Sequence, residues 1–140
     1  MKLSRRDTLA LGGAVATISL LPLRASATTE AATASLKEFT GGADWAEGGV
    51  ELTAPEIAEN GNTVPIAVSA PGAVAIAIVA DGNPNPGVAE YAFGELAEPM
   101  VATRMRLSGT QGIIAVAKMA DGSFKSASRA VKVTIGGCGG

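Results

Sequence analysis

The chain has 140 residues, of which 47% are hydrophobic, 17% are charged and 4% are aromatic. This length holds one domain with a real core and excludes two domains of ordinary size. There is no histidine and only one cysteine, which excludes Ser-His or Cys-His catalysis and the usual metal and haem ligand sets. No metal site or cofactor is therefore expected. The low aromatic content and the many small and β-branched residues favour sheets.

Residues 1–27 have the pattern of a cleaved export signal. An apolar run from Leu9 to Leu23 follows a charged start, and "ASA" at 25–27 predicts cleavage after Ala27. The run is shorter than the roughly 20 residues that span a bilayer, so no membrane anchor is expected. Arg5 and Arg6 lie in "SRRDTL", which is typical of twin-arginine signals, although ordinary signals can also carry an arginine pair.

The twin-arginine route carries folded proteins, usually because a cofactor is inserted before export. Since this sequence lacks the ligands for one, we infer a different reason for early folding. A partner subunit without its own signal would bind in the cytoplasm and cross together with this chain. The predicted location is the periplasm.

Removing the signal takes away four basic residues and one acidic residue, which leaves seven basic and twelve acidic residues and a net charge of about −5. Nucleic acid and anionic membranes are therefore poor partners. Most basic residues follow position 100, in the part of the chain that carries the cysteine. Two interpretations stay open for them: solvated strand faces, or a surface that attracts anions.

The first element of the mature chain is a short helix, and strands follow it. "TEAATASLKEFTGG" (29–42) places Leu36 and Phe39 at helical spacing and ends on two glycines. In "TVPIAVSA" (63–70) Val64, Ile66 and Val68 alternate, which predicts a strand. Pro65 has no amide hydrogen to donate, so this strand should lie at an edge or be irregular there.

Further strands follow with a period of two. "AVAIAIVA" (73–80) places Val74, Ile76 and Ile78 on one face, and "MVATRMRLSG" (100–109) alternates in the same way. The Asp121-Gly122 pair predicts the tight turn of a hairpin between two long strands. The whole is an all-β chain of about seven strands, typical of an immunoglobulin-like antiparallel β-sandwich over residues 28–135, with the short helix at its start.

Candidate catalytic groups are scarce. Four carboxylates could in principle act as acid and base, but exposed acids in an acidic half of the chain are better interpreted as solvated: Glu56, Glu59, Glu95 and Glu98. Trp45 is the lone tryptophan, and core or partner contact is favoured over ligand stacking. The chain is therefore predicted not to be an enzyme, and any chemistry rests on Cys138.

Cys138 lies in "GGCGG" at residues 136–140, where Gly136, Gly137, Gly139 and Gly140 flank it. These glycines add no side chains and little backbone preference, so the segment is predicted to be a thin, flexible arm. No internal disulfide is possible with one cysteine, although the chain is sent to an oxidising compartment. The alternatives are an intermolecular disulfide and a cysteine of no consequence.

The terminal "GGCGG", the preceding "DGSFKSASRAVKVTIGG" and the earlier "APEIAENGNTVPIAV" resemble the SoxY family of sulfur carriers. This resemblance implies that Cys138 holds sulfur intermediates of thiosulfate oxidation, first an S-thiosulfonate and then a persulfide. It also implies a heterodimer with a SoxZ-type subunit that lacks a signal, and three enzymes that meet the arm. These are a haem c sulfur-transferring enzyme, a sulfate-releasing hydrolase and a sulfur dehydrogenase. The competing hypothesis is an exported structural module cross-linked through its terminal cysteine.

Overall fold

The structure is a computed structural model that describes residues 24–135 of the chain. Its elements follow in chain order: helix α2 (Arg24–Thr40) and strands β1 (Ala46–Glu47), β2 (Glu51–Thr53), β3 (Ile57–Ala58), β4 (Val64–Ser69), β5 (Ala73–Ala80), β6 (Gly87–Ala92), β7 (Met100–Met105), β8 (Gln111–Met119) and β9 (Phe124–Val133). The predicted export signal with Arg5 and Arg6, apart from residues 24–27, and the whole predicted arm lie outside these residues.

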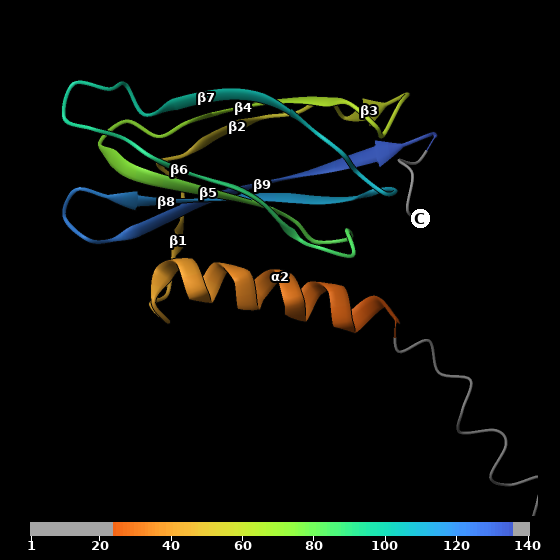
Figure 1. Cartoon of the computed structure of the whole chain (residues 1–140), viewed down its shortest axis with the longest axis horizontal. Coiled ribbons are helices and arrows are strands. Elements are labelled where there is room, and N and C mark those ends of the chain that lie inside the picture. The colour runs from red at the N-terminus through yellow and green to blue at the C-terminus, as the bar shows by residue number, and fades with distance from the viewer. Residues whose placement is uncertain (1–23, 136–140) are drawn as a thin grey trace, which may run out of the picture.

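The strands form two sheets that pack face to face (Figure 1). Sheet A has the order β1-β9-β8-β5-β6, with β3 also paired to β9, and sheet B has the order β2-β4-β7. The predicted all-β, immunoglobulin-like sandwich is confirmed, and the seven strands of three or more residues match the expected number. The two shortest strands, β1 and β3, pair with β9 in parallel, which the sequence did not indicate.

The main core lies between the sheets. The alternation predicted for β4 is confirmed, because Val64, Ile66 and Val68 are at most 4% exposed. Ile76 and Ile113 face them from sheet A and are fully buried. These β-branched side chains give the core its volume without large rings.

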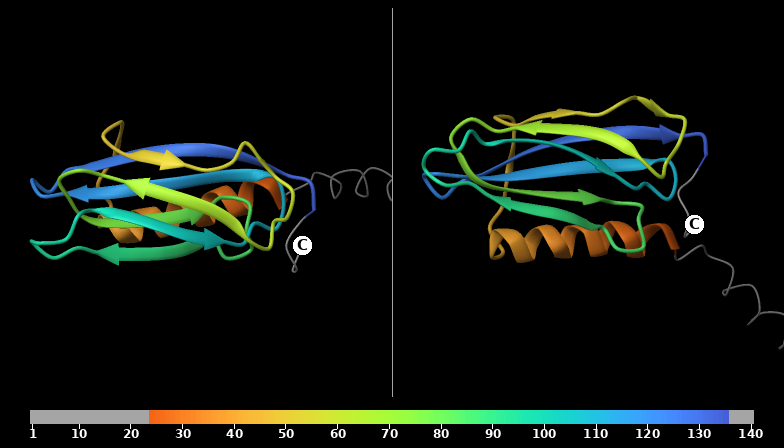
Figure 2. Two further views of the ribbon diagram at one scale, coloured as in Figure 1. Left: turned by 90° about the horizontal axis from the view of Figure 1, so that it is seen from above. Right: turned by 45° about the horizontal axis from the view of Figure 1, so that its top comes forward.

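Helix α2 covers the outer face of sheet A, as Figures 1 and 2 show from three sides. Ala32 and Leu36 pack there with Val79, Val116 and Phe124 in a second apolar cluster. Both faces of β5 are therefore buried, which explains its nearly continuous apolar sequence. The predicted helix is confirmed, but it begins at Arg24, so the expected cleavage site after Ala27 falls inside it.

Two details of the predicted strands differ from the structure: the face of Val74, and the place of Pro65 in its sheet. Val74 does not share the inward face of Ile76, because the register shifts between Ala73 and Ala75 and leaves Val74 39% exposed. Pro65 lies on β4, which is the central strand of sheet B and not an edge. However, β2 ends at Thr53, opposite Ala67, so β2 does not reach the level of Pro65.

The β8–β9 hairpin is confirmed, with Gly122 at a φ of +86° in its turn. Asp121 accepts hydrogen bonds from the Ser123 hydroxyl at 2.6 Å and from the Ser123 amide at 2.9 Å. These two bonds lower the pKa of Asp121 below its ordinary value, the hydroxyl contributing most. The carboxylate thus fixes the turn from which β9 starts.

We expect Leu36→Ala to lower the free energy of unfolding by about 2–4 kcal/mol, because it empties the contact between α2 and sheet A. Urea denaturation followed by circular dichroism measures this. Leu96→Ala is the matched control, since Leu96 is 103% exposed against 1% for Leu36. Equal effects of the two substitutions would contradict the packing of α2 on the sheet.

Candidate functional site

The predicted site, Cys138 with its four glycines, lies outside the described residues. The nearest described part of the chain is the end of β9 and the two residues that follow it. The last described residues continue β9 to Ile135 at one end of the sandwich. We call this the arm end (Figure 1). The β8–β9 turn at 120–123 and the loop at 93–99 lie at the opposite end, which we call the hairpin end. The arm therefore starts at the tip of the longest strand.

The final residues of β9 are held on one side by the segment 56–59. The Lys132 amide donates to the Glu56 carbonyl at 2.9 Å, and the Thr134 amide donates to the Ala58 carbonyl at 3.0 Å. The Thr134 hydroxyl adds a hydrogen bond of 3.1 Å to the Glu59 carbonyl. This short parallel pairing extends the ordered strand towards the arm.

The other side of β9 is held by Thr110. Its hydroxyl accepts the Val133 amide at 3.0 Å and also lies 3.5 Å from the Val133 carbonyl oxygen. The hydroxyl thus replaces a main-chain partner where β8 has not yet begun. The end of β9 is fixed from both sides.

Gly61 joins the start of the arm to sheet B. Its amide donates to the Ile135 carbonyl at 2.8 Å, and its own carbonyl accepts the Leu107 amide at 2.7 Å. Cys138 follows Ile135 by three residues, so an extended chain places it at most about 10 Å beyond this anchor. The thiol is thus confined to a short radius around the arm end.

A polar network braces the neighbouring loops at the arm end. The Gly112 amide donates to Asp81 Oδ1 and the Gly82 amide donates to Gln111 Oε1, both at 2.8 Å. Gln111 Nε2 also donates to Asn83 Oδ1 at 2.8 Å. Because Gln111 is only 8% exposed, these bonds satisfy a nearly buried amide and hold the loops together.

The basic residues of the C-terminal part are divided unequally between the two ends of the molecule. Lys118 and Lys125 pair with residues next to the hairpin turn. The other four lie in the half towards the arm end, and all are exposed: Arg104, Arg106, Arg129 and Lys132. Glu56, Glu59 and Asp81 lie in the same half, so its charge is mixed and both interpretations stay open.

The four candidate carboxylates are not brought together either. Glu56 and Glu59 belong to the arm end, whereas Glu95 and Glu98 lie in the loop at the hairpin end, and all four are exposed. No group of three or more potential metal ligands occurs within residues 24–135. Trp45 packs against the cluster under α2, as the prediction of a core contact required.

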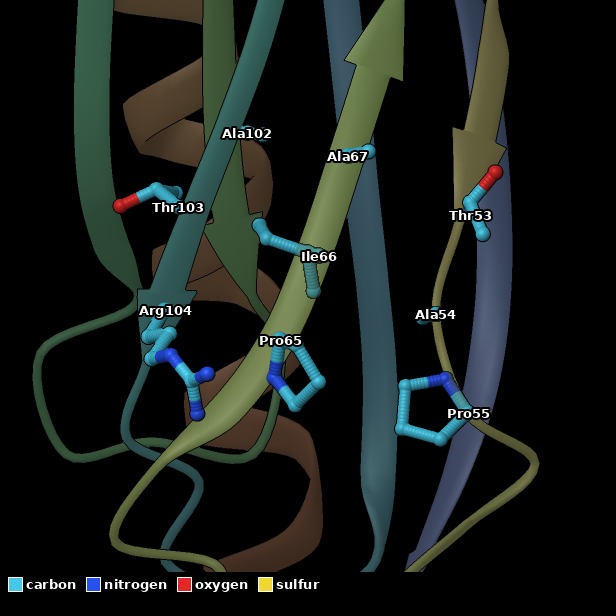
Figure 3. Close-up of a pocket in the computed structure, with 9 residues that line it drawn as sticks. All are labelled: Thr53, Ala54, Pro55, Pro65, Ile66, Ala67, Ala102, Thr103 and Arg104. Carbon is cyan, nitrogen blue, oxygen red and sulfur yellow. The ribbon is translucent and has the colours of Figure 1, made fainter.

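A shallow hollow of about 620 Å³ opens on the outer face of sheet B (Figure 3). It is lined mostly by small and cyclic side chains of β2, β4 and β7 and of the segment after β2: Thr53, Ala54, Pro55, Pro65, Ala67 and Ala102, with Arg104 at one end. No titratable side chain other than Arg104 lines it. The hollow therefore lacks the groups of a catalytic centre.

Comparisons with known proteins agree with this architecture. The family model of the sulfur oxidation protein SoxY matches residues 36–138. The sulfur carrier protein SoxY from Chlorobium limicola f thiosulfatophilum superimposes with a TM-score of 0.66 and 35% identity, covering 74% of this chain and 96% of that chain. Superoxide reductase (neelaredoxin) from Ignicoccus hospitalis superimposes with a TM-score of 0.54 and 22% identity over 61% of this chain and 80% of that one, a likeness of fold alone. No curated protein sequence matches.

A chain with this immunoglobulin-like sandwich and a single cysteine near the end of its sequence, matched in this way, is a sulfur carrier and not a catalyst. The chain belongs to the SoxY family and acts within sulfur oxidation by the Sox system. The family match extends to Cys138 itself, beyond the last described residue. Within the described part of the chain, no helix is long and apolar enough to cross a membrane.

Sequence reasoning found the thiol but missed the residues that anchor its arm. "PEIAENG" was one of the segments that resemble the family, but the sequence did not show what this segment does. In the structure its main chain holds the end of β9 by hydrogen bonds. Thr110 carried no signal at all, since its contact joins residues 23 positions apart in the sequence. Only the pairing of β8 with β9 reveals it.

We expect Gly61→Pro to loosen the anchor, because proline has no amide hydrogen to donate to the Ile135 carbonyl. Losing one hydrogen bond, a net ~0.5–1.5 kcal/mol, should raise amide hydrogen exchange at Thr134 roughly two- to tenfold. Gly61→Ala keeps the donor and serves as the control. If both variants exchange like the unmodified chain, Gly61 does not anchor the arm.

Proposed function

We propose that this chain is a periplasmic carrier in thiosulfate oxidation that holds its sulfur intermediates covalently on Cys138. The observation that carries the proposal is the position of the single cysteine, three residues beyond an anchored strand end and framed by glycines, in a chain of the SoxY family. The thiol can be offered to other proteins while the body of the carrier stays rigid.

The loading step requires an oxidant, which a haem c sulfur-transferring enzyme would provide. The Cys138 thiolate bonds to the sulfane sulfur of thiosulfate, two electrons pass to the haem enzyme, and Cys138 becomes an S-thiosulfonate. Thiolates are the reactive form in such sulfur chemistry. The carrier needs no base of its own, because each enzyme brings its own active site to the arm.

The next step is hydrolysis by a partner hydrolase. Water attacks the terminal sulfonate, the bond between the two outer sulfur atoms breaks, and sulfate and two protons leave while Cys138 retains a persulfide. A sulfur dehydrogenase would then oxidise the persulfide sulfur, passing its electrons to haem acceptors. A SoxZ-type subunit, without a signal, would form the heterodimer and share the twin-arginine export directed by Arg5 and Arg6.

We expect Cys138→Ser to abolish thiosulfate-dependent electron transfer in a reconstituted system, because no other side chain of the sequence offers a comparable nucleophile. Intact mass after incubation with thiosulfate and the haem enzyme measures loading directly. Circular dichroism and binding of the partner subunit should stay unchanged. Substantial turnover by the serine variant, or a product that is only a disulfide-linked dimer, would refute the carrier function.

We expect Gly137→Trp to slow enzymatic loading by more than about tenfold, equivalent to ~1.4 kcal/mol in the barrier, whereas Gly137→Ala loses far less. The reason is steric, since an arm that enters a narrow channel tolerates a methyl group better than an indole. Alkylation of Cys138 by a small reagent in free solution is the control and should be nearly equal in both variants. Parallel falls in loading and alkylation would mean that the glycines tune the thiol and not its passage.

A further inference from the structure

The short distance between Cys138 and the described part of the chain limits where an enzyme can stand. Cys138 follows Ile135 by three residues, so the thiol lies at most about 10 Å from the end of the anchored strand. An enzyme whose reacting atoms lie below its own surface must therefore bring that surface up to the arm end. Contact between the enzyme and described residues follows from the length of the segment.

The segment itself offers an enzyme little to recognise. Residues 136–140 carry no side chain except that of Cys138. A thiol and a glycine main chain do not distinguish this carrier from another glycine-rich peptide with a cysteine. Recognition must then come from side chains around the point where the segment starts.

Two large apolar side chains are exposed at this point. Ile57 on β3 is 57% exposed, and Ile135 is 68% exposed. The other three large apolar side chains that the described residues expose lie at the hairpin end: Val74, Leu96 and Met100. The ten residues of β9 span about 33 Å, so an enzyme engaged with the arm is far from those three.

The hydrogen bonds that anchor β9 also fix these two isoleucines relative to each other. Ile57 lies between the Glu56 and Ala58 carbonyls, and both carbonyls accept amides from the end of β9. The Ile135 carbonyl accepts the Gly61 amide. Main chain held in this way has little conformational freedom left to lose on binding, which favours association.

Charged side chains surround the two isoleucines. Lys132 is the register partner of Ile57, Glu56 and Glu59 flank the short strand β3, and all three are exposed. An apolar centre with charged residues at its margin is the composition of a protein–protein contact. We call these five residues the base patch: Glu56, Ile57, Glu59, Lys132 and Ile135.

Ile57 lies close enough to the start of the arm to belong to the same interface (Figure 1). It pairs with Lys132, three residues before Ile135, which at about 3.3 Å per residue and ~4.8 Å between strands gives a separation of roughly 11 Å from Ile135. A weak, transient interface buries up to about 600 Å² on each partner, a disc of about 14 Å radius. A disc centred on the start of the arm therefore includes Ile57 and stops short of the hairpin end.

We propose that the base patch is the docking surface for the haem c sulfur-transferring enzyme, and that it contacts an apolar rim around the entrance through which Cys138 reaches the reacting atoms. This inference rests on the proposed function, which supplies the enzyme. The described side chains then determine how tightly the enzyme holds the carrier, and the enzyme's own groups determine how fast the thiol reacts. Changes in the base patch should therefore move KM for the carrier and leave kcat unchanged.

The test measures the rate of loading by the haem c enzyme as a function of the concentration of the full mature chain. Ile57→Lys should raise KM at least about tenfold with kcat unchanged, because an apolar rim does not solvate its ammonium group. Leu96→Lys is the matched control, since it adds the same charge to a side chain that is 103% exposed at the hairpin end. It should load like the unmodified chain. No rise in KM for Ile57→Lys, or an equal rise in both variants, overturns the assignment.

Ile57→Thr separates docking from a structural role of Ile57. Threonine keeps the β-branched shape that suits a strand but makes the side chain polar, so KM should rise by a smaller factor than in Ile57→Lys. Amide hydrogen exchange at Lys132 and Thr134 reports the pairing of β3 with β9 and should be unchanged in both variants, as should alkylation of Cys138 in free solution. A rise in KM accompanied by faster exchange would mean that the anchor was loosened, and it overturns the inference. Self-association of the unmodified chain that Ile57→Lys abolishes, measured by sedimentation, would assign the patch to a second copy instead.

The outcomes separate this inference from the proposed function. If the unmodified chain loads thiosulfate and Ile57→Lys loads with the same KM, the carrier function stands and the base patch is wrong. If Ile57→Lys lowers kcat and leaves KM unchanged, Ile57 acts on the reaction step and not on docking, which also refutes the patch. If the unmodified chain never loads, the carrier function and the base patch both fail.

Discussion

The position available to Cys138 depends on how firmly the end of β9 is held, because the five residues of the predicted arm extend only a short distance from it. Hydrogen bonds from the segment 56–59, from Thr110 and from Gly61 fix the strand as far as Ile135. Any loosening there would widen the positions of the thiol and lower its effective concentration at an enzyme entrance. The anchored strand end and the glycine-rich sequence that follows it therefore belong to one functional unit in the proposed carrier.

The two sheets of the sandwich support this strand end in different ways. Helix α2 closes the outer face of sheet A over Leu36, so β5 is buried on both sides and gives the neighbouring strands β8 and β9 a stable base. Sheet B is shorter, with three strands, and its outer face stays open. The outer face of sheet A is thus covered by an element of the described chain, and that of sheet B is not.

Sequence patterns predicted the fold correctly where the structure is determined by residues close together in the sequence. The alternation of Val64, Ile66 and Val68 and the Asp121-Gly122 turn are local signals, and both are confirmed. Val74 was misplaced because a bulge depends on the partner strand and leaves no periodic trace. The parallel pairing of β3 with β9 spans only two residues, too few for any pattern, so the anchor was invisible although the thiol was not.

The charged side chains of the described residues do not form a reactive centre beside the predicted arm. Lys118 and Lys125 lie at the hairpin end, Glu56, Glu59 and Lys132 lie at the arm end, and no group of three or more potential metal ligands occurs in the described part of the chain. Exposed charges of both signs at a strand end do not form a centre that would activate the thiol, and a group that did so for one reaction would also expose a sulfur intermediate to unwanted exchange. Under the proposed function, reactivity is left to the partner enzymes, and the carrier controls where its thiol can be.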